Sequence, residues 1–390
     1  MNTVVFTALE ILFGAVGLYL AFCVTLLFGL AVAGLFYRSK KRTLPADPER
    51  SFLVMIPAYR EDAVILATLE AARGIDYPAE KYDIQVIAQH LKPETVARLR
   101  DLGALVTELN VESSTKVKAL KAGAAALARS YDGVVILDAD NHPKPDLLRI
   151  ADAELAAGRR AIQGHRAAKN TDTRTAWWDA VSEEMNHHLQ GKGPAVLGLS
   201  GRLAGSGMVF DGKLFFDYLP KLEAIGGFDK ELALYLNRDR IWVDYVEAAV
   251  VWDEKVASEA VFQKQRQRWL AAQYQFLAKH ALGGLKGFFT GNWHYALQVA
   301  WLALPPRILV PVLTAGGAAL SWLTGIYPYA WTVLFIAATL AYAFSIPRPF
   351  WNRHMLAMLG RIPALIWRTL IALTGMKEAR KRFIHTPHQS

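Results

Sequence analysis

The chain has 390 residues, 53% of them hydrophobic, which fits one large domain or one domain with membrane segments. Two basic flanks, Arg38–Arg42 and Arg348–Arg382, carry +4 and +7 of the formal net charge of +9, so the remaining residues sum to −2. That nearly neutral remainder argues against a nucleic-acid-binding domain, and the single Cys23 excludes an intramolecular disulfide.

Three apolar stretches predict membrane helices. Ile11–Phe36 has no charged residue and the first basic flank follows it at once, which predicts an uncleaved anchor. Near the other end lie Ile308–Thr324, which contains Pro311, and Tyr327–Ile346; a buried helical hairpin is the alternative for this pair. Because basic residues gather on the cytosolic side, we expect an external amino terminus, and a domain and tail in the cytosol.

These stretches divide the chain into four expected parts. They are an anchor with its basic flank (1–42), a cytosolic domain (43–292), an interfacial segment with two transmembrane helices (293–346), and a basic amphipathic tail (347–390). The domain shows no internal repeat or low-complexity run, so we expect it to fold as one body.

Strands alternate with helices through the first part of the domain. We expect strands at Ser51–Ile56, Asp83–Ala88, Ala104–Thr107 and Gly133–Leu137, and helices at Ala63–Arg73, Pro93–Leu102 and Thr115–Ser130. This alternation predicts a mostly parallel α/β sheet with helices on both faces. The sheet suits a nucleotide, although neither G-x-G-x-x-G nor G-x-x-x-x-G-K occurs.

The first strand runs into Pro57-Ala58-Tyr59-Arg60-Glu61-Asp62. The ring of Tyr59 and the carboxylate of Glu61 suit stacking on a base and binding of a ribose at the carboxyl end of a strand. An ordinary turn into the next helix, with Glu61 or Asp62 near its start, is the alternative.

The fourth strand ends in Asp138-Ala139-Asp140. Since side chains alternate along a strand, both carboxylates are expected to point the same way from its carboxyl end. Two carboxylates this close repel each other unless a cation lies between them, and a hard divalent cation that also binds phosphate meets that need. A helix start, with Asp140 or Asn141 as N-cap and Pro143 in the first turn, is the alternative.

Three segments in the second half complete the set of candidates. In Leu197–Met208, four glycines and two serines let the backbone approach a ligand, or form a plain flexible loop. Asp229 lies at an expected helix start, where a cap is the simpler role. Gln265-Arg266-Gln267-Arg268-Trp269 lies on a long helix over Ser258–His280, which also suits a membrane surface. Gln163-Gly164 is expected to end another strand, and Thr175–Gln190 to form a helix.

Four segments in this order resemble the family 2 glycosyltransferases, particularly the membrane-embedded cellulose, chitin and hyaluronan synthases. They are A-Y-R-E-D, D-A-D, G-S-G-M with D-K-E-L, and Q-R-Q-R-W. The resemblance covers residues 51–280 and implies a GT-A-like fold, flanked by transmembrane helices, in a bacterial inner membrane. It implies an inverting transfer from a nucleotide sugar, with UDP as the nucleotide, to a saccharide or lipid-linked acceptor. Membrane lipids, further copies of the chain and an export partner are the other expected partners.

The resemblance also assigns roles to particular residues. Asp138 and Asp140 hold Mg²⁺ or Mn²⁺ against the diphosphate, and Asp229 is the general base. The remaining assignments are donor binding by Tyr59, Glu61, Asp138, Gln265, Arg268 and Trp269, and acceptor binding by Gly205, Ser206, Gly207, Met208 and Trp269. Lys116 and Lys118 fall where relatives carry basic residues near the nucleotide, or are solvated helix charges.

Two positions depart from the family pattern. Gln89 stands where an acid usually binds the base and ribose, and Phe228 stands where Glu usually precedes the general base. The alternative function is therefore a catalytically inactive, nucleotide-binding partner of a polysaccharide-export complex. A transporter is disfavoured, because the apolar segments are few and carry no buried charge pair.

Overall fold

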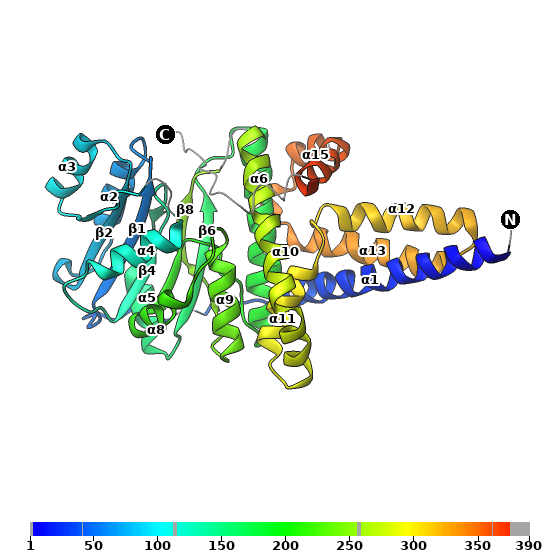
Figure 1. Ribbon diagram of the computed structural model, residues 1–390, viewed down its shortest axis with the longest axis horizontal. Coiled ribbons are helices and arrows are strands. Elements are labelled where there is room, and N and C mark those ends of the chain that lie inside the picture. The colour runs from blue at the N-terminus through cyan, green and yellow to red at the C-terminus, as the bar shows by residue number, and fades with distance from the viewer. Residues whose placement is uncertain (1–2, 41, 112–114, 256–258, 361, 375–390) are drawn as a thin grey trace. The chain divides into compact units, whose positions relative to one another are not determined.

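The computed structural model describes residues 3–40, 42–111, 115–255, 259–360 and 362–374 (Figure 1). The chain divides into two compact units. The sheet unit comprises Arg38–Glu183, Leu199–Leu302 and Ala372–Ser390, and the helical unit comprises Met1–Tyr37, Glu184–Gly198 and Ala303–Ile371.

Over the described ranges, eight strands of the sheet unit form one sheet in the order β3-β2-β1-β4-β7-β6-β8-β5. Every neighbouring pair is parallel except β4–β7, β6–β7 and β5–β8, so only β5 and β7 run against the rest. The prediction of a mostly parallel α/β sheet is therefore confirmed. The strands are β1 (Phe52–Tyr59), β2 (Tyr82–Gln89), β3 (Leu105–Glu108), β4 (Gly133–Ile136), β5 (His142–Pro143), β6 (Ala161–Ala168), β7 (Met208–Asp211) and β8 (Asp244–Asp253).

Two hydrophobic cores lie on the two faces of the sheet, and β1 contributes to both by simple alternation. Phe52, Val54 and Ile56 belong to one core, together with α2, α3 and α5, while Leu53 and Met55 belong to the other, with α4, α8 and α9. Helices cover both faces, as expected. The helices of this unit are α2 (Ile65–Arg73), α3 (Pro93–Asp101), α4 (Lys116–Ala125), α5 (Leu147–Ala156), α8 (Gly212–Tyr218), α9 (Phe228–Arg238), α10 (Glu259–Phe289) and α11 (Trp293–Ala303).

The helical unit is built on α1 (Thr3–Leu35), α12 (Leu309–Thr324) and α13 (Pro328–Ser345), which lie side by side in Figure 1. Trp331 of α13 packs against Leu20 of α1 and Ala318 of α12. A Cβ on Gly317 would come within 2.1 Å of the Trp331 ring, so only glycine admits this close approach. The helix α6 (Arg174–His187) continues as a π-helical turn (His188–Lys192) and α7 (Gly193–Val196), whose Gly193 packs on the Leu30 backbone. The last helices are α14 (Arg353–Leu359) and α15 (Ile362–Thr374).

Two of the three predicted spans meet the length and hydropathy expected of a membrane helix in the described residues. They are Thr7–Leu35 and Pro328–Ser345; Leu309–Thr324 is apolar but shorter. At about 1.5 Å per residue this third helix is about 24 Å long, less than a typical hydrocarbon core of about 30 Å. Part of the predicted basic tail, residues 375–390, lies outside the described residues.

Several predicted element ends need correction. The strand predicted to end at Gln163-Gly164 continues through Ala168, because a bulge between Gly164 and His165 lets β6 stay paired with β8. The helix predicted over Thr115–Ser130 spans only Lys116–Ala125, with the Thr115 side chain accepting a hydrogen bond from the Lys118 amide. The helix predicted over Thr175–Gln190 gives way to the π-helical turn after His187.

Candidate active site

The carboxyl ends of β1, β2 and β4 meet at one edge of the sheet. Parallel pairing places Tyr59 opposite Gln89, and Met55 opposite Ile136 two residues before Asp138. In open α/β sheets this edge is where ligands bind. The predicted donor residues at the ends of β1 and β4 therefore share one edge.

Asp138 and Asp140 lie in a turn, not on the strand as predicted. The strand β4 ends at Ile136, and the Asn141 amide donates to the Asp138 carbonyl at 3.1 Å to close the turn. We call residues 138–141 the D-A-D turn. The alternative of a helix start at Asp140 or Asn141 is wrong, because Pro143 belongs to β5 and α5 begins at Leu147.

The D-A-D turn is fixed from several sides. Asp140 is buried; its Oδ2 accepts from the Glu254 amide at 3.0 Å, and its Oδ1 accepts from Asn141 Nδ2 at 3.2 Å. The Lys169 ammonium donates to the Asp140 carbonyl. Asn141 Oδ1 accepts from the Asp138 amide at 3.0 Å. The position of the Asp140 carboxylate is thus set by backbone and side-chain donors together.

Lys116 joins three predicted parts of the site. Its ammonium donates to the Asp138 carboxylate, donates to the Gly205 carbonyl at 2.8 Å, and lies 5.2 Å from the centre of the Phe228 ring. From the sequence, this lysine could either contact the nucleotide or be a solvated charge on a helix. The structure places it at the D-A-D turn, with a cation directly on one of the two paired carboxylates.

The start of α9 and the Q-R-Q-R-W segment of α10 lie against each other. Gly227 is the N-cap of α9 with φ +74°, a conformation that favours glycine, and Asp229 is the second helical residue. Arg268 passes over the preceding glycine, since a Cβ on Gly226 would lie 3.5 Å from Arg268 Cγ. Asp229 is therefore not the N-cap, and its side chain makes no capping hydrogen bond.

Arg268 of α10 is close enough to Asp138 for their charges to interact. Burial lowers the pKa of its guanidinium below the ordinary value, and the carboxylate of Asp138 opposes that shift. The neighbouring Trp269 is 41% exposed, so one face of its ring is available to a ligand. Gln265 is half-buried, and its Oε1 has no partner among the described residues.

The glycine loop, residues 204–207, is held by side chains of β6. Gln163 Oε1 accepts from the Ala204 amide at 2.8 Å and its Nε2 donates to the Ser206 carbonyl at 3.0 Å. Arg166 Nη1 donates to the Ala204 carbonyl at 2.7 Å. Gly207 has φ +62°. The alternative of a plain flexible loop is therefore disfavoured, since its backbone groups have fixed partners.

The remaining predicted residues differ in burial and in their neighbours. Ser206 is fully buried and its Oγ has no partner among the described residues, while Met208 begins β7 and packs in the core. Tyr59 stacks edge-on against His90 with ring centres 5.5 Å apart, and Glu61 is buried just after it.

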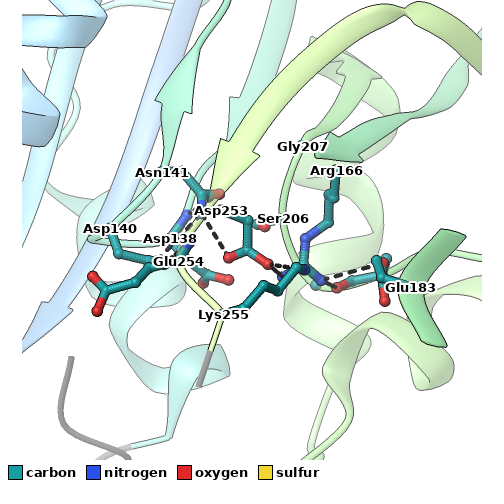
Figure 2. A network of polar contacts seen from close by, with 12 residues as sticks. Asp138, Asp140, Asn141, Arg166, Glu183, Ser206, Gly207, Asp253, Glu254 and Lys255 are labelled. Carbon is teal, nitrogen blue, oxygen red and sulfur yellow. Dashed lines mark hydrogen bonds and ion pairs between the residues drawn. The ribbon is translucent and has the colours of Figure 1, made fainter. Parts of the chain in front are cut away.

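Sequence reasoning missed a buried ionic network beside the turn (Figure 2). Asp253, the last residue of β8, accepts from Arg166 Nη2 at 2.6 Å and Lys255 Nζ at 2.7 Å. Burial alone would raise the pKa of Asp253, but these two cations hold it well below its ordinary range. The signal was present, because Val250–Asp253 repeats the pattern of a hydrophobic strand that ends in an acid at the same edge.

Comparison with known proteins identifies the domain that carries this site. A family model described as glycosyltransferase-like family 2 matches residues 48–272, which is more than half of the chain. The chain belongs to this family. The matched range includes the D-A-D turn, the glycine loop, the start of α9 and the Q-R-Q-R-W segment.

The proteins similar to the chain include two curated relatives and a solved structure. The chain is 31% identical over 109 residues to the cellulose synthase catalytic subunit of Komagataeibacter sucrofermentans, covering 27% of this chain and 14% of that protein. It is 26% identical over 242 residues to the β-monoglucosyldiacylglycerol synthase of Synechocystis sp., covering 58% of this chain and 49% of that protein. The chain thus matches about half or less of these relatives. A mannosyltransferase from Pyrobaculum calidifontis, in complex with GDP-Man and Mn²⁺, has a TM-score of 0.52 at 18% identity, covering 86% of this chain and 98% of that one, which shows the same GT-A-like fold.

Proposed function

We propose that the chain is an inverting glycosyltransferase that moves a sugar from a nucleotide-sugar donor, with UDP as the expected nucleotide, to a saccharide or lipid-linked acceptor. The observation that carries the proposal is the gathering of Asp138, Lys116, Gly205 and Arg268 at the carboxyl edge of the sheet, beside the start of α9. This is a site with both charge signs, suited to a diphosphate and a cation. Membership of glycosyltransferase family 2 and the fold of the solved neighbour support it.

The residues at the D-A-D turn fit a divalent cation that also binds the donor. The Lys116 ammonium already places one positive charge on the Asp138 carboxylate. Among the described residues, no three His, Cys, Asp or Glu side chains are grouped to hold a metal alone. Two carboxylates with phosphate oxygens and water are the ligand set that Mg²⁺ commonly takes. Asp138 and Asp140 would hold Mg²⁺ or Mn²⁺, which would neutralise charge on the leaving diphosphate.

The other side chains perform the transfer. Asp229 accepts the proton of the acceptor hydroxyl as its oxygen bonds to the anomeric carbon and the bond from that carbon to the diphosphate breaks. Attack opposite the leaving group inverts the anomeric configuration. Arg268 offers its planar, charged N–H groups to the diphosphate, and the exposed ring of Trp269 offers a face for a sugar. Tyr59 and Glu61 bind the nucleoside, and Gln265 also binds the donor. The glycine loop and Met208 bind the acceptor.

The proposed location is a membrane, with the sheet unit in the cytosol. Two helices are apolar and long enough to span, and the basic residues Arg38 to Arg42 follow the first. A limited product, one or a few sugars on a membrane acceptor, fits a chain with few spans, while polymer synthesis would need further copies or an export partner.

The direct test incubates the purified full chain with Mn²⁺ and a panel of UDP- and GDP-sugars in the presence of membrane lipids and oligosaccharides. We expect release of a nucleoside diphosphate from one donor, and a product heavier by the mass of one or more sugars. Binding of a nucleotide sugar without any release would favour the inactive export partner instead.

The membrane placement has its own test, in a Cys23→Ser background so that no native thiol remains. Cysteines at the exposed Ser39 and Tyr327 lie on opposite sides of the membrane if α12 spans it. We expect an impermeant thiol reagent to label Tyr327→Cys from outside intact cells, and Ser39→Cys only after lysis. Labelling of both positions from outside would contradict the topology.

A further inference from the structure

The buried carboxylate of Asp253 lies between the two halves of the candidate site. Its Oδ1 accepts from Asn141 Nδ2 at 3.3 Å, and that same amide nitrogen donates to Asp140. Its Oδ2 accepts from Arg166, which donates its other terminal nitrogen to the Ala204 carbonyl. Figure 2 shows Asp253 between Asn141 on one side and Arg166 on the other. One carboxylate therefore contacts a residue of the D-A-D turn and a residue that holds the glycine loop.

Further charged side chains lie around Asp253. Glu183 of α6 lies 3.9 Å from Arg166 and 2.6 Å from Arg202, so the two arginines share it. Lys255 is buried and donates to Asp253. Removing the Asp253 carboxylate would take away an anion that Arg166 and Lys255 share, and loss of one partner of a buried ion pair is strongly unfavourable. The Asp253 carboxylate therefore helps to hold both cations in place.

A network of this kind does more than hold the fold. Buried ion pairs often add little stability compared with well-packed hydrophobic residues, so a costly network beside a site calls for another explanation. Here the contacts of Asp253 with Asn141 and Arg166 each lead within one residue to a group of the candidate site, the Asp140 carboxylate and the Ala204 carbonyl. A shift of the carboxylate by one methylene length would move Asn141 and Arg166 together.

We propose that Asp253 is a positioning residue that couples the D-A-D turn to the glycine loop, so that the donor side and the acceptor side adopt their working geometry together. This inference rests on the proposed function. When a nucleoside diphosphate and a divalent cation bind at Asp138 and Asp140, the constraint passes through Asn141, Asp253 and Arg166 to the Ala204 carbonyl. The glycine loop then becomes more rigid before the acceptor arrives.

Hydrogen exchange on the full chain in detergent tests the coupling without an acceptor. Mn²⁺ is added with UDP, GDP, ADP or dTDP, and peptides that cover residues 199–212 are followed by mass spectrometry. We expect the nucleotide that binds the native chain to slow exchange in the glycine loop. In Asp253→Asn this protection should be lost, and nucleotide affinity should fall by about 10–100-fold, the range for residues that orient metal ligands.

Asp152 provides a matched control. It is also a buried carboxylate, pairs with Arg50 at 2.7 Å, and accepts from the Tyr77 hydroxyl at 3.1 Å. Asp152→Asn should lower the unfolding temperature but leave nucleotide affinity and loop protection unchanged. If Asp253→Asn gives the same profile as Asp152→Asn, the positioning role is overturned.

Two further variants keep the inference falsifiable if Asp253→Asn fails to fold. Asp253→Glu keeps the charge but displaces it, and should retain binding with reduced loop protection. Arg166→Lys keeps the charge that faces Asp253 but cannot bridge to Ala204, so it should bind nucleotide normally without protecting the loop. Native loop protection in both variants would overturn the coupling. A native chain that bound none of the nucleotides would overturn the proposed function itself, and this inference with it.

Discussion

The D-A-D turn and the start of α9 place carboxylates in opposite ways. Asp140 is buried and receives hydrogen bonds from a backbone amide and an asparagine, in a turn that Lys169 also holds. Asp229 is half-buried at the second position of a helix, and no described residue forms an ion pair or hydrogen bond with its carboxylate. A carboxylate that must present fixed charge benefits from such constraint, whereas one that must take up a proton needs an accessible oxygen. The difference supports the proposal that the turn places charge and that Asp229 on α9 takes up the proton.

Removing charge from the turn should have the largest effect. We expect Asp138→Asn to lower metal-dependent transfer by at least about 10³-fold, because an amide attracts a divalent cation far less than a carboxylate does. The measurement is the rate of nucleoside diphosphate release against Mn²⁺ concentration. Asp146→Asn is the matched control, since both side chains pair with a lysine and are about equally exposed, at 34% and 31%. Equal activity of the two variants would refute the charge-placing role of the turn.

Removing the proton acceptor should separate binding from turnover. We expect Asp229→Asn to lower kcat by about 10²–10⁴-fold while donor affinity stays within about twofold, because a general base acts only as the acceptor attacks. Titration calorimetry gives the affinity, and steady-state kinetics give kcat. Near-native turnover would transfer the role to another acid; Glu231 is the nearest on α9, but it is buried and accepts from the Glu223 and Ala224 amides.

A third carboxylate, that of Asp179, is expected to affect the stability of the fold. Burial raises the pKa of Asp179, on α6, to about 6. The folded chain therefore binds more protons than the unfolded chain between pH of about 4 and about 6, and the stability contributed by this group is lost as pH rises through about 6. We expect Asp179→Asn to raise the unfolding temperature at pH 8 by a few degrees, and by less than a degree near pH 4. A gain that does not vary with pH would contradict this.

The sequence predicted the framework well because its signals are local. The apolar run Phe52–Ile56 and the apolar run before Asp138 each specify a buried strand without reference to the rest of the chain. Two of the family motifs, A-Y-R-E-D and D-A-D, follow strands that end at one edge of the sheet. Asp229 at the second position of α9, and Arg268 on a long helix, follow from the same kind of local pattern.

Contacts between segments that are distant in the sequence could not be predicted from local patterns. The network of Asp253, Arg166 and Lys255 joins residues from β6 and β8 that are nearly ninety positions apart, so no spacing rule indicates it. Lys116 was equally ambiguous, because a lysine at a helix start is usually solvated. The turn at Asp138 was missed for another reason: β4 ends at Ile136, one residue before its predicted end, and Asn141 then forms hydrogen bonds back to Asp138.

The stereochemistry of a single turnover tests the central claim most directly. The donor that the native chain uses is labelled with ¹³C at the anomeric carbon, and the product is followed by NMR in the presence of Mn²⁺. An α-linked donor should give a β-linked product, at a rate that falls in Asp229→Asn and is unchanged in Asp146→Asn. A product of retained configuration, or a rate that is the same in the native chain and Asp229→Asn, would contradict direct displacement with Asp229 as the base.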